Sequence, residues 1–371
     1  MTIIIFIIVL AILIFVHELG HFLFARWNGI RVDEFKIGFG PKIFAWGKGE
    51  TKYGLNLIPF GGFVKIHGEN PDNDSINGPD KARSFVNKKK WQQITVLAAG
   101  VFFNFLFAWL IYTSIFIFGV TATTGGFQDY ASNFTNERIM ITNISAGSPA
   151  EKAGLKMGDI INGVNDNVVD IKPDQAQSFS VSEIQNVINS SNGEPVSFSY
   201  VRGKSKTTTI QVIPEKGIIA DKYAIGIAMD NVVDLRLPFF TAIYEGGHYT
   251  LVMIRDTTIG LYNFFADIFR GTANFSDVSG PIGIAGIVGD AAGLGFTYLL
   301  MITALISINL GVINFIPFPA LDGGRILFAI IEGIIRRNIP ANFANIVNAI
   351  GFILLMILMV VVTYKDIAKL F

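Results

Sequence analysis

The motif His-Glu-Leu-Gly-His at positions 17–21 ends an N-terminal run in which residues 2–16 carry no charge. Two histidines four residues apart lie on one face of a helix, so both imidazoles can bind one metal ion, and Glu18 between them can take a proton from water at that metal. In the helices of soluble proteins, residues that match this pattern are often surface residues without a catalytic role. Near the centre of a bilayer, however, each unpaired ionisable group costs about 2 to 3 kcal/mol. We therefore expect His17 and His21 to bind a metal ion, most naturally zinc.

The composition indicates a membrane protein with a moderate soluble part, because 51% of the 371 residues are hydrophobic and only 16% are charged. The net charge of zero gives no sign of nucleic-acid binding. Cysteine is absent, which excludes disulfides, cysteine-bound zinc and a thiol nucleophile. The start of the chain has no basic residues ahead of its apolar run, so we expect a retained span rather than a cleaved signal peptide.

Four stretches are long and apolar enough to cross a bilayer. They are residues 2–24, 94–120, 296–318 and 345–363. The third stretch runs into Asn314 and two prolines, which predicts a broken inner end. Residues 239–271 are apolar but interrupted by charges, so we expect an amphipathic interfacial helix, with a fifth span as the open alternative.

The distribution of basic residues predicts the topology. The segment 25–93 is rich in lysine and arginine, which places it in the cytoplasm, with the longer insert after the second span outside. The first span then reaches the two histidines at the same depth as the third span reaches Asp322. Asp322 followed by two glycines also fits a loop turn or a helix cap. The matched depth favours Asp322 as a third ligand over Glu332, which lies farther along and resembles an interfacial charge.

The insert contains a small predicted domain over residues 137–230. Its signals are a strand near 138–144, a short helix capped by Ser148 and ended by Gly154, and a strand at 160–164. An amphipathic helix and a hairpin follow, at 181–188 and 195–213. On the other side of the membrane, alternating apolar residues between 31 and 66 predict strands that either cover the metal site or pair with an extended substrate at Gly61 and Gly62.

With the histidine motif in the first span and Asn-Phe-Ile-Pro-Phe-Pro-Ala-Leu-Asp-Gly-Gly at 314–324, the chain resembles the site-2 protease family of intramembrane zinc metalloproteases. The resemblance covers nearly the whole chain and is nearest to the bacterial regulator of sigma-E protease branch. It implies that His17, His21 and Asp322 bind zinc, that Glu18 is the general base, and that Asn314 engages substrate near the metal.

Further motifs extend the resemblance. They include Pro-Phe-Gly-Gly-Phe-Val-Lys at 59–65 and a Gly-x-x-x-Asn pattern at 100–104. Gly100 fits helix packing, and for Asn104 we expect a hydrogen bond to the substrate backbone or to a group that supports the ligands. Residues 147–169 resemble a PDZ domain of the circularly permuted bacterial kind. That likeness places the peptide-binding strand last, at Ala224, Ile225, Gly226 and Ile227. Only one such unit is found, whereas the best-known members of the branch carry two.

The sequence thus predicts a polytopic α-helical membrane protein with about four transmembrane helices, a cytoplasmic-side β-loop and one extracytoplasmic PDZ domain of the α+β class. The expected segments are 1–24, 25–93, 94–120, 137–230, 231–295, 296–339 and 345–363. We expect a zinc metalloendopeptidase of the bacterial inner (cytoplasmic) membrane, with one catalytic Zn²⁺ and its active site toward the cytoplasm. Its expected partners are the lipid bilayer and single-span membrane proteins already cut by another protease, such as anti-sigma factors or remnant signal peptides, and not nucleic acid.

Two other functions fit parts of the pattern. A catalytically inactive PDZ adaptor with a structural zinc would need four protein ligands, but only three are found at the right depth. A zinc transporter would need further ligands along the spans, and the sequence offers none there.

Overall fold

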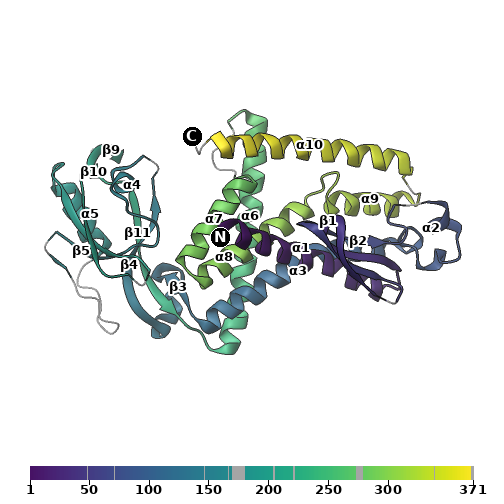
Figure 1. The fold of residues 1–371 in the computed structure, drawn as a ribbon, viewed down its shortest axis with the longest axis horizontal. Coiled ribbons are helices and arrows are strands. Elements are labelled where there is room, and N and C mark those ends of the chain that lie inside the picture. Colours follow the sequence, from purple (N-terminus) through teal and green to yellow (C-terminus); the bar gives the residue numbers. More distant parts are fainter. Residues whose placement is uncertain are drawn as a thin grey trace. The chain divides into compact units, whose positions relative to one another are not determined.

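The computed structural model describes residues 1–47, 49–70, 72–145, 147–165, 167–168, 180–203, 205–219, 222–272, 279–337 and 339–368. The chain divides into two compact units (Figure 1). Unit 1 comprises residues Met1–Ser114 and Ile243–Phe371, and unit 2 comprises Ile115–Ala242.

Four helices of the described chain are long and apolar enough to cross a membrane, as the sequence predicts. They are α1 (Thr2–Trp27), α3 (Lys90–Phe118), α8 (Phe296–Phe315) and α10 (Ala341–Ala368). Their length and composition are those of bilayer spans.

The third predicted span does break at its inner end. Helix α8 stops at Phe315, and α9 (Asp322–Ile335) begins after a six-residue loop, so the predicted segment 296–339 contains two helices. The loop contains Pro317 and Pro319, which lack a backbone N–H and disfavour helical geometry in the residues before them. The break delivers Asp322 at the first position of a new helix.

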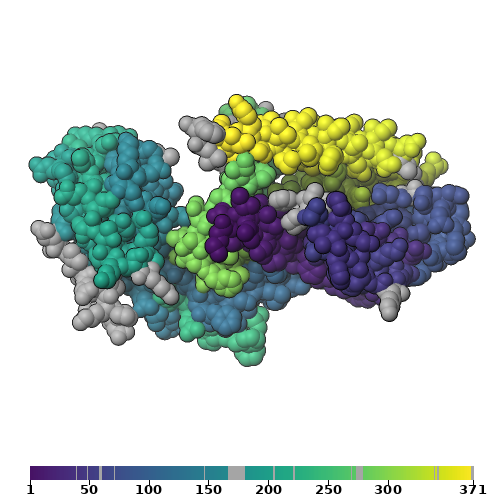
Figure 2. Space-filling model, viewed as in Figure 1, coloured from purple at the N-terminus to yellow at the C-terminus, as the bar shows by residue number. Residues whose placement is uncertain are grey.

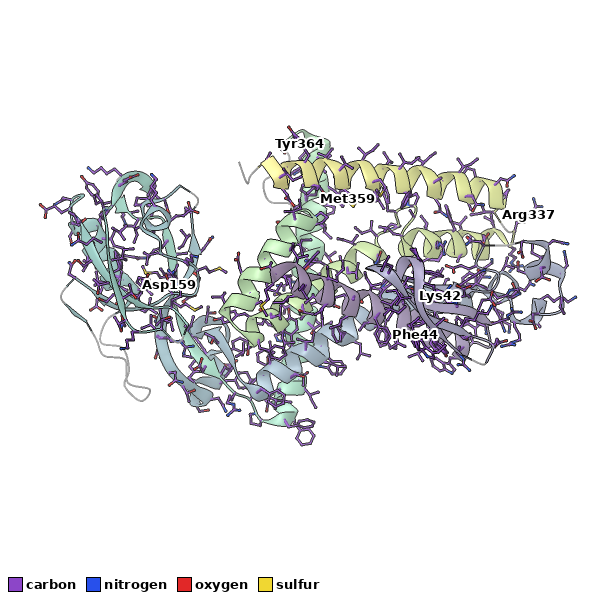
Figure 3. All side chains as sticks on the ribbon, in the orientation of Figure 1. Lys42, Phe44, Asp159, Arg337, Met359 and Tyr364 are labelled. Atoms are coloured by element: carbon purple, nitrogen blue, oxygen red, sulfur yellow. The ribbon has the colours of Figure 1, made fainter. Side chains whose placement is uncertain are left out.

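Helix α10 lies on the outside of unit 1, where its side chains form a continuous strip of surface (Figure 2). Met359 and Tyr364, labelled in Figure 3, are both exposed. A shorter apolar helix, α7 (Pro281–Leu294), packs against α1. Its Val288 shares a buried cluster with Val9 and Leu13, which anchors the half of α1 that precedes the histidines.

The basic segment after α1 contains two long antiparallel strands, β1 (Val32–Trp46) and β2 (Lys52–Ile66). Residues 34–37 of β1 pair with both ends of β2, namely with 52–55 and with 62–65, so β2 folds around β1. The last part of β2, residues 62–66, therefore pairs on one side only within the described chain. This strand segment is called the edge strand below. Phe44, at the far end of β1, is exposed (Figure 3).

Unit 1 also contains a short helix, two 3₁₀ turns and most of a long helix. Helix α2 (Asn73–Asn77) and two 3₁₀ turns, Lys81–Arg83 and Phe85–Asn87, connect β2 to α3. The apolar segment that is interrupted by charges forms one long helix, α6 (Phe239–Arg270). Its position at the membrane interface stays a prediction.

Unit 2 is built on an antiparallel sheet in the order β3-β11-β4-β5-β7-β8, with β6 added beside β5. The strands are β3 (Val120–Thr123), β4 (Phe134–Ile144), β5 (Ile160–Val164), β6 (Asn167–Val168), β7 (Val196–Val201), β8 (Thr208–Val212) and β11 (Ile227–Leu235). A separate hairpin joins β9 (Glu215–Ile219) to β10 (Lys222–Ala224). Two 3₁₀ turns, Thr124–Gly126 and Gln128–Asn133, lead into β4.

Two short helices of unit 2 lie where the sequence predicts them. Ser148 caps α4 (Pro149–Ala153), and Gly154 ends it with φ +94°. Helix α5 (Val181–Ser190) buries Ile184 and Ile188 in a core shared with the strands. The unit's boundaries are wider than the predicted 137–230, because β3 precedes that range and pairs with the end of β11 at Val120 and Leu235.

Candidate metal centre

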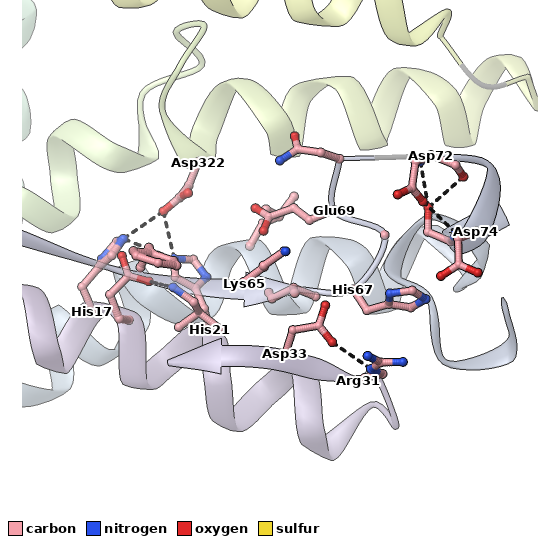
Figure 4. Close-up of a pocket in the computed structure, with 18 residues that line it drawn as sticks. His17, His21, Arg31, Asp33, Lys65, His67, Glu69, Asp72, Asp74 and Asp322 are labelled. Carbon is pink, nitrogen blue, oxygen red and sulfur yellow. Dashed lines mark hydrogen bonds and ion pairs between the residues drawn. The ribbon is translucent and has the colours of Figure 1, made fainter. Parts of the chain in front are cut away.

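The two histidines of α1 meet as their spacing predicts. The Nε2 atoms of His17 and His21 lie 3.2 Å apart, and the two residues are 9% and 8% exposed. Both imidazoles point away from the rest of α1 toward α3 and α9 (Figure 4). One turn of helix thus places two nitrogen ligands side by side.

Asp322 joins them from about 300 residues farther along the chain. Its Oδ2 atom lies 3.1 Å from Nε2 of His17 and 3.3 Å from Nε2 of His21. The loop before Asp322 packs closely against the start of α9, and this is possible because glycines follow Asp322. A Cβ at Gly323 would lie 2.2 Å from the carbonyl oxygen of Ile316. The two glycines therefore serve the geometry that brings the carboxylate to the histidines.

The three groups fit a zinc ion. Each offers one ligand atom, and all of these atoms lie within 4.8 Å of one another. Tetrahedral zinc with bonds of about 2.0 to 2.1 Å holds neighbouring ligand atoms about 3.3 Å apart. The observed separations of 3.1 to 3.3 Å match this value. Two histidines and one carboxylate are also the ligand set of catalytic zinc sites that keep a fourth position open.

Glu18 lies beside this cluster and contacts the edge strand. Its Oε2 accepts a hydrogen bond of 3.0 Å from the backbone N–H of Val64. Gly62 lies so near that a Cβ there would be 3.6 Å from Cγ of Glu18 and 3.2 Å from Ile14. The carboxylate is thus fixed by backbone, and the absence of a side chain at Gly62 leaves room for it.

Helix α3 supports the cluster from behind. Nδ1 of His21 lies 2.9 Å from the carbonyl oxygen of Val96, and the Nδ2 atom of Asn104 lies 3.1 Å from Nδ1 of His17. Between them, a Cβ at Gly100 would come within 2.4 Å of Nε2 of His21. Three residues spaced by one helical turn therefore face the two imidazoles.

A pocket of about 560 Å³ opens from the cluster along the edge strand. Figure 4 shows the histidines and Asp322 at one end and Asp72 and Asp74 at the other. The Ser75 hydroxyl and backbone N–H hold the pKa of Asp72 below its ordinary value. The pocket therefore leads along the edge strand to the three ligand residues.

His67 also lines the pocket and is only 8% exposed. Its burial follows from the backbone: its N–H donates to Arg31 and its carbonyl accepts from Phe85, which fixes it between two segments. Glu332, expected as an interfacial charge, lies 2.6 Å from Nζ of Lys90.

The remaining predicted site residues fall in four places. Asn314 is half-buried in the last turn of α8, and Gly61, with φ +104°, precedes the edge strand. Asn104, for which we expect either a substrate contact or a supporting one, is fully buried against His17. In unit 2, the residues 224–227 line a second pocket of about 380 Å³ together with α5.

Some contacts of the site cannot be predicted from residue types. The Val64 N–H and the Val96 carbonyl act through backbone atoms, which any residue type supplies. Only Gly100 and Gly62 hint at them, since each leaves space for a neighbouring side chain.

Known proteins resemble this chain over its whole length. The model of peptidase family M50 matches residues 5–358. A protein of Clostridium perfringens provisionally named a zinc metalloprotease is 37% identical over 358 residues, covering 96% of this chain and 95% of the relative. The regulator of sigma-W protease RasP of Bacillus subtilis is 30% identical over 100% of this chain and 99% of its own length. The zinc metalloprotease RasP of Geobacillus kaustophilus is 30% identical over 100% and 98%.

The four apolar helices and the RasP relatives indicate a multi-pass bacterial membrane protein. The family match and the zinc metalloprotease relatives fit the cluster of His17, His21 and Asp322 with Glu18 beside it. The chain therefore belongs to peptidase family M50, the site-2 protease family of zinc metalloproteases.

Proposed function

We propose that this protein is an intramembrane zinc endopeptidase that hydrolyses transmembrane segments of membrane proteins. The observation that carries the proposal is the position of Glu18 on α1, directly after an uncharged run over residues 2–16 and beside the convergent His17, His21 and Asp322. A general base next to a three-ligand zinc site is what peptide hydrolysis requires.

When bound by these three residues, zinc supplies a Lewis acid that makes water acidic and polarises the peptide carbonyl. Glu18 accepts the proton from the attacking water and returns it to the leaving amine. The Val64 N–H fixes the Glu18 carboxylate during both transfers. The three ligand atoms would come from His17, His21 and Asp322. Contacts with Val96 and Asn104 of α3 keep the two imidazoles in place.

The substrate must be unwound locally, because the backbone of a helix in lipid is hydrogen-bonded and shielded. The edge strand is the element best suited to receive it. Residues 62–66 pair on one side with β1, and the pocket runs along them to the metal ligands. An extended substrate adds a strand there through main-chain hydrogen bonds, with Gly61, Gly62 and Asn314 near its path.

Unit 2 acts as a single PDZ domain that selects substrates. Its groove lies between α5 and residues 224–227, with Lys222 at its wall. In a permuted PDZ domain that last strand binds a chain terminus, and Lys222 supplies positive charge for a carboxylate. The groove thereby admits membrane proteins that another protease has already cut and excludes larger intact ones.

The basic residues of segment 25–93 orient the protein. By the positive-inside rule, these residues favour a cytoplasmic location for the β1–β2 sheet and the metal site, with unit 2 outside the inner membrane. Cleavage then releases a cytoplasmic fragment, for example from an anti-sigma factor or a remnant signal peptide.

The test is cleavage of a single-span substrate in proteoliposomes by the wild type and by Glu18→Gln, with bound zinc measured in both. We expect cleavage to disappear while zinc is retained, because glutamine keeps the shape of Glu18 but cannot accept a proton. Equal activity of the two proteins would overturn the proposal. Absence of cleavage by the wild type, with zinc bound, would favour an adaptor with a structural zinc.

A further inference from the structure

Helix α3 presents a different partner to each histidine of the metal cluster. Nδ1 of His21 faces the carbonyl oxygen of Val96 at 2.9 Å, and Nδ1 of His17 faces the side-chain amide of Asn104 at 3.1 Å. Val96 and Asn104 are eight residues apart, so both lie on the face of α3 that carries Gly100.

The tautomer of each histidine follows from the metal cluster. Both Nε2 atoms converge on Oδ2 of Asp322 and thus carry the lone pairs that bind a metal. A neutral imidazole that uses Nε2 as ligand carries its proton on Nδ1. Both Nδ1–H groups are buried donors, and each needs an acceptor. The Val96 carbonyl provides one for His21.

At His17 the amide of Asn104 meets this requirement only in one of its two orientations. In one orientation the Nδ2 atom of Asn104 faces Nδ1 of His17, which sets a donor against a donor. The Oδ1 atom of Asn104 is meanwhile buried without a hydrogen-bond partner in the described structure. Oxygen and nitrogen of an amide exchange places by a half-turn, and their assignment follows from the hydrogen-bond network. The half-turn places Oδ1 against Nδ1–H of His17.

We infer that Asn104 is a positioning residue whose side-chain oxygen accepts the Nδ1–H of His17 and so fixes the tautomer and the ring orientation that leave Nε2 free for zinc. The inference rests on the zinc site of the proposed function.

The surroundings of Asn104 make it rigid enough for this role. The residue is 0% exposed, and its backbone carbonyl accepts a hydrogen bond of 2.8 Å from the hydroxyl of Ser307 on α8. Helices α3 and α8 are therefore connected at the residue that orients His17. Such partners of ligating histidines typically change metal affinity by about 10- to 100-fold when removed.

The experiment measures zinc affinity of the full-length protein in detergent by competition with a chromophoric chelator. Asn104→Leu removes the acceptor at similar volume and is expected to weaken zinc binding by about 10- to 100-fold. Asn104→Asp keeps an acceptor and has no donor, so it is expected to bind zinc at least as tightly as the wild type. The control, Phe102→Leu, changes an exposed side chain of the same helix and should leave affinity unchanged.

The Asn104→Asp variant distinguishes a side chain that accepts a hydrogen bond from His17 from one that donates a hydrogen bond to it. Loss of affinity in Asn104→Asp as large as in Asn104→Leu would overturn the inference, as would wild-type affinity in Asn104→Leu. Failure of the wild type itself to bind zinc would overturn the proposed function, and the inference with it.

A second measurement needs no variant and stays informative if Asn104→Leu does not fold. The chain has four histidines, so the ¹⁵N spectrum of the zinc-loaded protein is sparse. We expect His17 to show a protonated, hydrogen-bonded Nδ1 and a zinc-bound Nε2. Zinc bound through Nδ1 of His17 would contradict the inference.

Discussion

The backbone N–H of Val64 donates a 3.0 Å hydrogen bond to Oε2 of Glu18 and thereby connects the edge strand to the proposed general base. The contact joins two residues that are 46 positions apart in the sequence. It means that the strand proposed to receive the substrate also fixes the carboxylate that moves the proton.

Replacing Val64 by proline tests this connection, because proline has no N–H to donate to Glu18. Proline also alters the packing of a buried side chain, so it needs a control that changes the side chain alone. Hydrogen bonds to charged groups contribute about 1.5 to 3 kcal/mol, so kcat for a single-span substrate should fall by about 10- to 100-fold. Zinc content should stay that of the wild type, since Val64 contacts none of the ligands. The control, Val64→Ala, keeps the N–H and should retain more activity than Val64→Pro. The reverse order would show that the side chain matters and the hydrogen bond does not.

Gly100→Ala should abolish zinc binding. A Cβ at this position would lie 2.4 Å from Nε2 of His21 and 2.7 Å from Cε1 of His17, so the imidazoles could not keep their positions. Alanine at Gly286 of α7 is the matched control, since nothing lies within 4 Å of its Cβ. Bound zinc is measured by elemental analysis of the purified proteins. A Gly100→Ala protein that retained full zinc occupancy would disprove the close packing of α3 on the cluster.

The Arg138–Asp234 pair should make the sheet of unit 2 sensitive to acid. Burial raises the pKa of Asp234, but hydrogen bonds from Arg138 at 2.7 Å and from Asn136 outweigh it, so the pKa lies below its ordinary value. A carboxyl with a lowered pKa in the folded state stabilises the fold above its unfolded pKa of about 4, and this stabilisation is lost as pH falls through the lower folded value.

Hydrogen exchange of β4 and β11 in the whole protein measures this effect. Protection in both strands should decline as pH drops below about 4, after correction for intrinsic exchange. In Asp234→Asn the protection should be lower at neutral pH and nearly independent of pH in the same window. Equal pH profiles for the two proteins would rule out Asp234 as the acid-sensitive group.

Removal of unit 2 should widen the range of substrates. Val120 and Leu235 are paired across β3 and β11, so a short glycine linker from Gly119 to Arg236 can replace residues 120–235. If the groove excludes intact proteins, the shortened enzyme should cleave uncut single-span substrates as fast as clipped ones, with zinc content unchanged. Loss of hydrolysis of clipped substrates would contradict a purely selective role for this unit.

The sequence predicts the metal cluster because its chemistry is carried by side chains of fixed type. The spacing of His17 and His21 sets one helix face, and the positive charges beside the spans place Asp322 at the same depth. The structure brings these three groups together as expected. The prolines near Asp322 likewise predict the break between α8 and α9.

The boundary of unit 2 and the backbone contacts of the site could not be predicted, because they depend on contacts between segments that no local sequence pattern encodes. Val120 to Thr123 form a strand only because β11 lies beside them, so the predicted boundary of unit 2 starts too late. His67 is buried through its backbone hydrogen bonds, and a lone histidine in a polar segment gives no sign of that. Partners such as the Val96 carbonyl are backbone atoms and have no residue signature.

The position of the cut tests the central claim most directly. A single-span substrate is incubated with the wild type in proteoliposomes, and mass spectrometry of the products locates the new termini. The account predicts termini inside the apolar segment, absent with Glu18→Gln and after zinc is removed by a chelator. Termini found only outside the apolar segment, or cleavage that persists in Glu18→Gln, would contradict an intramembrane zinc endopeptidase.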